Sequence, residues 1–194
     1  RALPKSPALV SSKKMEPFDT PNLKTIDELT SNFKIKPNRL VKSILYFADG
    51  SPIAACVRGV QEVHEGKLRK LLSIKELRLA HPDEIEKITK APLGFTGPVG
   101  LKGVKIIADG DIVSMSDFVT GANQKDKHFS HVDFNRDFKA DQVADIRYVQ
   151  EGDRCRECNQ GLSLITTMEV GHVFKLGTRY SEPFKALYLA ADGK

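Results

Sequence analysis

Residues 38–47, NRLVKSILYF, constrain the fold of this chain more than any other stretch. Their aliphatic, β-branched and aromatic side chains are typical of a half-buried β-strand. A single lysine, Lys42, stands near the start of this stretch. An ammonium group is costly inside a sheet unless it reaches water or a partner, and the long lysine stem often reaches water. Lys42 therefore either lies at a sheet edge in solvent or binds an anion at the mouth of a pocket.

Local signals on both sides of this strand predict its neighbours. Asp49-Gly50 is a hairpin turn that leads into a second buried strand at 53–57. Upstream, Thr25 and Glu28 form a capping box, which predicts a helix of about ten residues. Helices are also expected at 63–72 and from His81 to before Pro92, and strands at 77–80, 104–108 and 129–134. Short strands interleaved with single helices predict an α/β (α+β) fold, with a mixed, largely antiparallel sheet or barrel and surrounding helices.

The two ends of the chain differ in character from its middle. Residues 1–18 have no amphipathic period and are expected to be a linker or an N-terminal arm. A domain is expected at 19–150, followed by a separate piece at 151–194. In that last piece, 162–167 and 169–174 have the alternation of strands.

Composition limits the possible partners and compartment. The chain has 194 residues, with 30 basic and 25 acidic side chains, and the resulting net charge of +5 moderately favours a polyanionic partner. No apolar run approaches the ~20 residues that span a membrane. Three cysteines without regular spacing indicate a reducing compartment, and the cytoplasm is predicted.

The pair Cys155-x-x-Cys158 is half of a zinc knuckle. A closed zinc site needs four ligands, and the third cysteine, Cys56, lies far upstream. His172 does not complete a standard zinc-finger spacing. The pair is therefore interpreted as a knuckle remnant or a tight turn, and neither a metal nor a cofactor is predicted.

A glycine-rich loop occupies residues 94–100, GFTGPVG. It lacks the lysine and the serine or threonine of a phosphate-binding loop, and it does not connect a strand to a helix as a dinucleotide fingerprint must. Such a loop is either an ordinary turn or a place where bare backbone amides approach a ligand closely. Both interpretations remain open from the residues alone.

Taken in order, four segments resemble the editing insertion of bacterial prolyl-tRNA synthetases, which is related to the freestanding deacylases of the YbaK type. They are Asp19-Thr20-Pro21, the Lys42 strand, the 94–100 loop and the run 128–133, HFSHVD. The resemblance covers roughly residues 17–149. Residues 152–194 resemble the synthetase core that follows the insertion, but the ATP-binding arginines of that core are absent, so no synthetase activity is expected.

The resemblance implies a function: hydrolysis of mischarged alanyl-tRNA(Pro), by water attack that the tRNA ribose hydroxyl assists. It assigns catalytic roles to Lys42, Gly94, Gly97 and Pro98, with Gly94 and Gly97 as alternatives for the same position in the loop, and substrate-binding roles to Thr20, Asp109 and His128. From the residues alone, Thr20 and Asp109 are equally well explained as turn residues and His128 as a structural histidine.

The same resemblance implies the partners. They are the acceptor end of tRNA(Pro) and the remainder of the synthetase, with no membrane, and the parent enzyme is expected to be a homodimer. Two alternatives remain. One is a module that binds the acceptor end without catalysis, and the other is a hydrolase of small metabolites, whose activity would be insensitive to salt.

Overall fold

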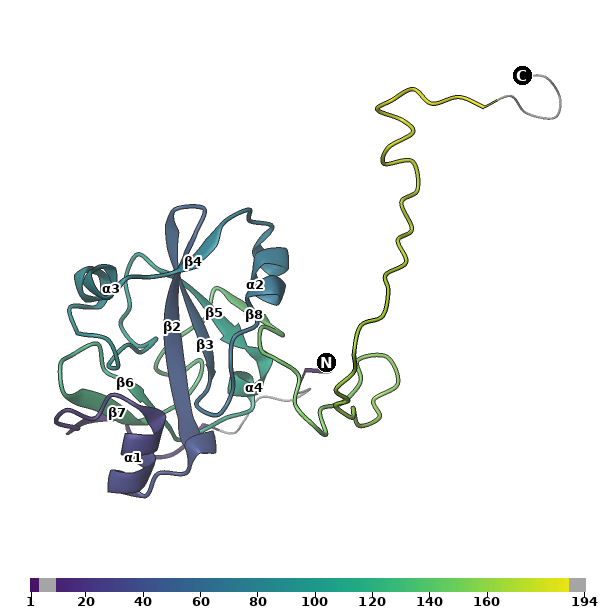
Figure 1. Ribbon diagram of the computed structural model, residues 1–194. Coiled ribbons are helices and arrows are strands. Elements are labelled where there is room, and N and C mark those ends of the chain that lie inside the picture. Colours follow the sequence, from purple (N-terminus) through teal and green to yellow (C-terminus); the bar gives the residue numbers. More distant parts are fainter. Residues whose placement is uncertain (4–9, 189–194) are drawn as a thin grey trace. The chain divides into compact units, whose positions relative to one another are not determined.

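The computed structural model describes residues 1–3 and 10–188. The chain divides into two compact units, Arg1–Ser163 and Leu164–Lys194. All helices and strands of the described residues lie in the first unit (Figure 1). Among these residues no helix is long and apolar enough to cross a membrane.

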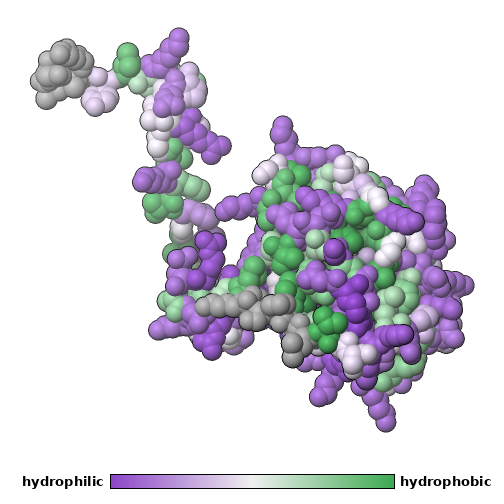
Figure 2. Space-filling model, turned by 180° about the vertical axis from the view of Figure 1, so that it is seen from behind, coloured by the Kyte–Doolittle hydropathy of each residue, from purple (hydrophilic) through white to green (hydrophobic). Residues whose placement is uncertain are grey.

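The described part of the second unit is irregular apart from turns at 177–185, without helix or strand. Its apolar side chains, such as Val170 and Val173, are exposed among hydrophilic ones (Figure 2). The strands predicted at 162–167 and 169–174 are therefore wrong. Alternating side chains form a strand only where a neighbouring strand pairs with the backbone, and the sheet of the described residues includes no strand at these positions.

A single sheet forms the centre of the first unit. Its strands are β1 (Glu16–Asp19), β2 (Leu40–Ala48), β3 (Ser51–Arg58), β4 (Leu77–Leu79), β5 (Lys105–Asp109), β6 (Phe118–Gly121), β7 (Lys127–Val132) and β8 (Gln142–Ala144). The order is β1-β7-β6-β2-β3-β5-β8, with β4 also paired to β2. Strand β2 is antiparallel to β3 and β4 and parallel to β6, so the sheet is mixed, as predicted.

The described residues form four α-helices and one 3₁₀ helix. They are α1 (Ile26–Phe33), α2 (Glu65–Leu72), α3 (Pro82–Thr89), the single turn α4 (Gly110–Val113) and the 3₁₀ helix η1 (Pro37–Arg39). At the start of α1, the Glu28 N–H donates to Thr25 Oγ1 (3.2 Å) and the Thr25 N–H donates to the Glu28 carboxylate (2.8 Å). The capping box predicted from the sequence is confirmed.

The β2–β3 hairpin is the central pair of the sheet. Asp49 and Gly50 have φ values of +45° and +82°, as a two-residue turn with the twist of a hairpin requires. The register continues without a break from Val41 opposite Arg58 to the turn. Hydrophobic clusters cover both faces, because Leu45 and its neighbour Tyr46 belong to different clusters. The hairpin and the burial predicted for these two strands are confirmed.

One edge of β2 is only partly paired. Strand β6 pairs with it at Leu40 and Val41, and β4 pairs with it from Tyr46 to Ala48. Residues 42–45 therefore have no ladder partner on this edge. This gap in the sheet, between β4 and β6, positions the site described below.

Three strands and one helix had no clear sequence signal. Strand β1 lies at the end of the predicted 1–18 arm and pairs with β7. Strands β6 and β8 are short, and α4 begins where only a turn was expected, directly after Asp109. The domain ranges 1–18, 19–150 and 151–194 stay predictions.

Candidate active site

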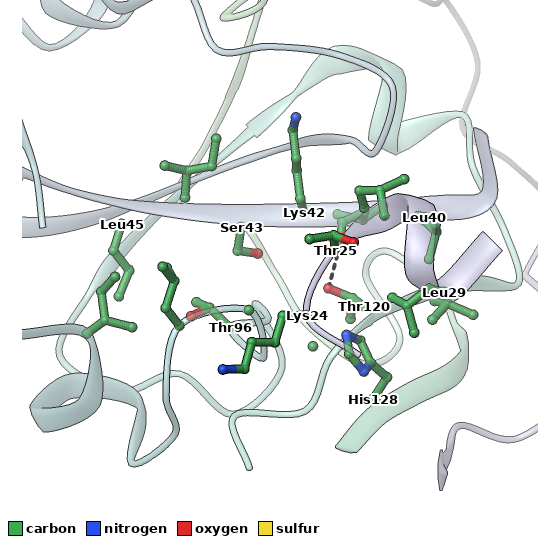
Figure 3. A pocket seen from close by; sticks show the side chains of 18 of the residues that line it. Lys24, Thr25, Leu29, Leu40, Lys42, Ser43, Leu45, Thr96, Thr120 and His128 are labelled. Atoms are coloured by element: carbon green, nitrogen blue, oxygen red, sulfur yellow. Dashed lines mark hydrogen bonds between the residues drawn. The ribbon is translucent and has the colours of Figure 1, made fainter. Parts of the chain in front are cut away.

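A cavity of about 460 Å³ lies at the gap in the sheet (Figure 3). Its wall is mostly apolar, with a few polar groups, which is the usual character of a small-molecule site. The lining includes Lys24, Leu29, Leu40, Ser43, Leu45, Ile85, Gly94, Thr96, Thr120 and His128. Three of the segments singled out in the sequence thus border one space: the Lys42 strand, the glycine loop and the start of β7.

The backbone of Ser43 faces this gap. The C=O of Val41 accepts from Thr120 Oγ1 (2.9 Å), and the C=O of Leu45 accepts from the Ala80 N–H (3.0 Å). Alternate residues of a strand direct their backbone groups to the same side, so the N–H and C=O of Ser43 point into the gap. A strand edge with free backbone groups is a ready hydrogen-bonding surface for a ligand.

His128 forms a buried wall of the cavity. Its side chain is only 3% exposed, and its Nδ1 lies 2.7 Å from Oγ1 of Thr20, which is fully buried. The ring of Phe95 packs 5.5 Å from the imidazole, centroid to centroid. Burial lowers the pKa of His128 to about 4, so the imidazole is neutral at neutral pH. The structure brings Thr20 and His128, two of the predicted substrate-binding residues, into contact, although only His128 lines the cavity.

Gly94, like Thr96 of the same loop, borders the cavity. Its φ is +103°, and a methyl group there would lie 2.6 Å from Cβ of Lys24. The N–H groups of Gly94 and Thr96 have no hydrogen-bond partner among the residues that the structure describes. These amides are therefore available to a ligand.

Gly97 and Pro98 lie outside the cavity lining. A methyl group at Gly97 would lie 1.7 Å from the carbonyl oxygen of Gly121 in β6, so two backbones cross at this point. The Gly97 N–H donates to Oδ1 of Asn123 (2.9 Å), whose side-chain amide donates back to the Gly97 C=O (3.0 Å). The Gly97 amide is therefore occupied, and the residue fixes the loop on β6.

Lys42 belongs to the lining, but its ammonium group points away from the cavity. Figure 3 shows its side chain leaving β2 on the side opposite to His128 and Thr120. The ammonium nitrogen lies 2.5 Å from a carboxylate oxygen of Glu62, whose side chain is 70% exposed. An exposed pair of this kind contributes at most about 1 kcal/mol, so it does not lock the lysine in place.

Lys24 is a second lysine of the cavity, and sequence reasoning missed it. Its amino group lies on the same side of β2 as Thr96 and His128 (Figure 3). It makes no ion pair with any carboxylate in residues 1–3 and 10–188. The only sequence signal is its position just before the N-cap Thr25, which many helices share.

Asp109 does not line the cavity. It is fully buried, pairs with the guanidinium group of Arg1, and accepts from the N–H groups of Asp111 and Ile146, both at 3.0 Å. It caps α4 and ties this turn to the segment after β8. These are the contacts of a structural carboxylate, and the arrangement does not support the predicted substrate contact.

The described residues contain no group of three or more His, Cys, Asp or Glu side chains that could hold a metal ion. Cys155 and Cys158 are free thiols. The Cys155 N–H donates to the C=O of Gln160 (2.7 Å), and Arg154 forms a bridge with Gly161. The pair therefore lies in a tight hairpin turn.

The chain is similar in sequence to curated proteins of known name. The chain is 48% identical over 183 residues to a proline–tRNA ligase of Geobacter metallireducens, covering 94% of the chain and 32% of the relative. It is 48% identical over 177 residues to a proline–tRNA ligase of Thermoanaerobacter sp. strain X514, covering 90% and 31%. The chain thus spans about a third of the length of the curated relatives it matches.

A solved structure described as a "putative trans-editing enzyme for prolyl tRNA synthetase" has the same fold, with a TM-score of 0.57 and 19% identity over 70% of this chain and 87% of that one. The model of the aminoacyl-tRNA editing domain matches residues 20–137, which include the gap in the sheet, the glycine loop and His128. The resemblance seen in the sequence is confirmed, and the chain belongs to the family of aminoacyl-tRNA editing domains.

Proposed function

We propose that the chain hydrolyses the ester between alanine and the terminal ribose of mischarged alanyl-tRNA(Pro). Its relatives are named proline–tRNA ligases. An activation site sized for proline excludes the smaller alanine by only about 1–3 kcal/mol, because lost apolar contact discriminates weakly. A second site that admits alanine and rejects proline supplies the missing fidelity.

The observation that carries the proposal is the meeting of three features in one cavity. The free edge of β2 at Ser43, the unpartnered amides of Gly94 and Thr96, and the neutral ring of His128 all border it. Amides of this kind polarise the ester carbonyl and stabilise the oxyanion that forms during water attack. The ribose hydroxyl of the substrate assists that attack, and the His128 wall limits the size of the amino-acid side chain.

Two lysines supply positive charge for the acceptor end. Lys24 lies on the inner side of β2, and its ammonium group forms no ion pair among the described residues, whereas Lys42 lies at the rim and pairs with the exposed Glu62. We assign Lys24 to the bound end of the RNA. Lys42 leaves Glu62 when the negatively charged backbone arrives, since a surface pair is weak.

The partners that we propose for the chain also follow from its family. The acceptor end of tRNA(Pro) is the partner at the cavity, and the rest of a synthetase is the covalent neighbour. A homodimeric parent enzyme and a cytoplasmic location stay predictions.

The test is deacylation by the purified chain, with alanyl-tRNA(Pro) and prolyl-tRNA(Pro) measured side by side. Rapid release of alanine and slow release of proline support the proposal. Binding of the tRNA without release of either amino acid identifies a docking module instead. Release that does not change with salt identifies a hydrolase of small metabolites, because phosphate-anchored binding weakens steeply with salt.

A further inference from the structure

A second cavity, of about 480 Å³, lies beyond the C-terminal end of α1. We call it the basic groove, and define it by Phe18, Phe33, Lys34, Lys36, Arg39 and Val119. The first cavity is bordered by Lys24 and Thr25, at the N-terminal end of the same helix. The two sites therefore flank α1.

The charge of the basic groove is positive. Lys34 and Lys36 form no ion pair with a carboxylate in the described part of the chain, and no acidic side chain lines the groove. Arg39 is partly neutralised, because its guanidinium lies 2.7 Å from the Asp117 carboxylate. Two free ammonium groups in a concave surface attract a polyanion.

An aromatic ring lies beside these charges. Phe33 is 42% exposed, and its ring is held edge-to-face against Phe18 with the centroids 5.2 Å apart. A fixed and accessible ring next to lysines is the combination that binds single-stranded nucleic acid, since bases stack on the ring while ammonium groups contact the phosphates.

The basic groove shares part of its wall with the first cavity. Val119 lines both sites, and Phe18 packs on His128 with the ring centroids 6.2 Å apart. Helix α1 has eight residues and spans about 12 Å, a distance that a few nucleotides cover. A strand whose last nucleotide enters the first cavity can therefore pass α1 and reach the groove.

We infer that the basic groove binds the single-stranded nucleotides that precede the terminal adenosine of the RNA acceptor end. Lys34 and Lys36 contact phosphates, and Phe33 stacks on a base. This inference rests on the proposed function, because it assumes that the first cavity holds the end of the same RNA.

The test uses an uncharged hairpin RNA with the single-stranded 3′ end ACCA and the same hairpin with a blunt end. Binding to the whole chain is measured by fluorescence anisotropy at several salt concentrations. Because neither RNA carries an amino acid, the result does not depend on hydrolysis. A failed deacylation assay and a failed groove test are therefore separate outcomes.

The wild-type chain should bind the tailed hairpin more tightly than the blunt one. The double variant Lys34→Ala/Lys36→Ala should lose about tenfold in affinity for the tailed hairpin, and its slope of log affinity against log salt should fall by about 1.4, the value for two phosphate contacts on a single strand. Phe33→Ala should lose about tenfold with the slope unchanged. Lys70→Ala, at an exposed position of α2, is the matched control and should bind as the wild type does.

Three results would overturn the inference. They are equal binding of tailed and blunt RNA by the wild type, equal losses for both RNAs in the double variant, and an unchanged salt slope in that variant. Thermal melting is followed for each variant. If Phe33→Ala unfolds, the double lysine variant decides the matter alone, because its side chains are on the surface.

Discussion

Thr20 and His128, which are 108 positions apart in the sequence, meet inside the protein with Oγ1 and Nδ1 separated by 2.7 Å. Thr20 precedes α1, and His128 lies in β7. The contact fixes the plane of the imidazole and engages one of its nitrogens. It therefore connects the turn before α1 to the wall of the cavity.

Loss of the Thr20 hydroxyl should destabilise the fold. Thr20→Val keeps the shape of the side chain but leaves Nδ1 of His128 buried without a partner, which costs about 1–3 kcal/mol. Thr20→Ser keeps the hydroxyl and should lose less. Urea unfolding of both variants measures the difference. Equal stability of the serine and valine variants would show that the hydrogen bond contributes nothing.

His128 should control the choice between alanine and proline. His128→Ala removes a ring from the cavity wall, so the enlarged site should release proline from its tRNA much faster than the wild type does. The measurement is the ratio of the two deacylation rates. A variant that is folded and keeps the wild-type ratio would remove His128 from the specificity of the site.

Stability should fall as the pH falls from about 6.5 to about 4. The pKa of His128 is lowered from 6.5 to about 4 in the fold, so the unfolded chain takes up a proton at a pH where the folded chain does not. The stabilisation is complete above pH 6.5, and its loss by pH 4 amounts to about 3 kcal/mol. Urea unfolding of the wild type and of His128→Asn over this range isolates the contribution. Parallel pH curves for the two proteins would contradict it.

Substitution of the two loop glycines, Gly94 and Gly97, should affect stability and deacylation differently. Gly97→Ala places a methyl group 1.7 Å from the Gly121 carbonyl oxygen, so the loop must separate from β6, and both stability and deacylation should fall. Gly94→Ala strains a residue with φ of +103° and displaces Lys24, so deacylation should fall more than stability. Gly161→Ala is the control, because a methyl group there has no atom within 4 Å. Wild-type activity in both loop variants would exclude the loop from the reaction.

The roles of Lys42 and Lys24 in substrate binding can be tested with a Glu62 variant as the control. Lys42→Ala and Glu62→Ala break the same pair; Glu62→Ala, at the exposed member, should change stability by no more than about 0.5 kcal/mol, whereas Lys42→Ala also removes a stem that is only 22% exposed and should cost more. If Lys42 contacts the RNA, only its own variant should lose most of the deacylation, and Lys42→Arg should recover part of it. Lys24→Ala should raise KM for the tRNA. Full activity of both lysine variants would show that neither ammonium group holds the substrate.

Much of the fold could be predicted because its signals are local. The Thr25–Glu28 capping box and the Asp49-Gly50 turn each depend on residues close together in the chain. The gap beside β2 could not be predicted, since it depends on where two distant strands end. Likewise, nothing local to Lys24 indicates that Gly94 packs against it.

The position of Asp109 also depends on distant residues. Its sequence context, a carboxylate before glycine, fits both a pocket and a turn, and only the distant Arg1 and Ile146 decide that it is held inside the fold. A family pattern assigns a role to a position, but the partners of that position come from the whole chain.

Hydrogen exchange at the open edge of β2 should report whether a ligand is bound in the cavity. Backbone amides in the middle of a central strand normally exchange with solvent deuterium only when the sheet opens. The amide of Ser43 has no strand beside it, so it should exchange much faster than those of Ile44 and Tyr46, which face β3 in the same strand. A ligand that bonds to this edge should slow that single amide. Deuterium uptake at Ser43 therefore gives a readout of binding that needs neither a labelled substrate nor a chemical step.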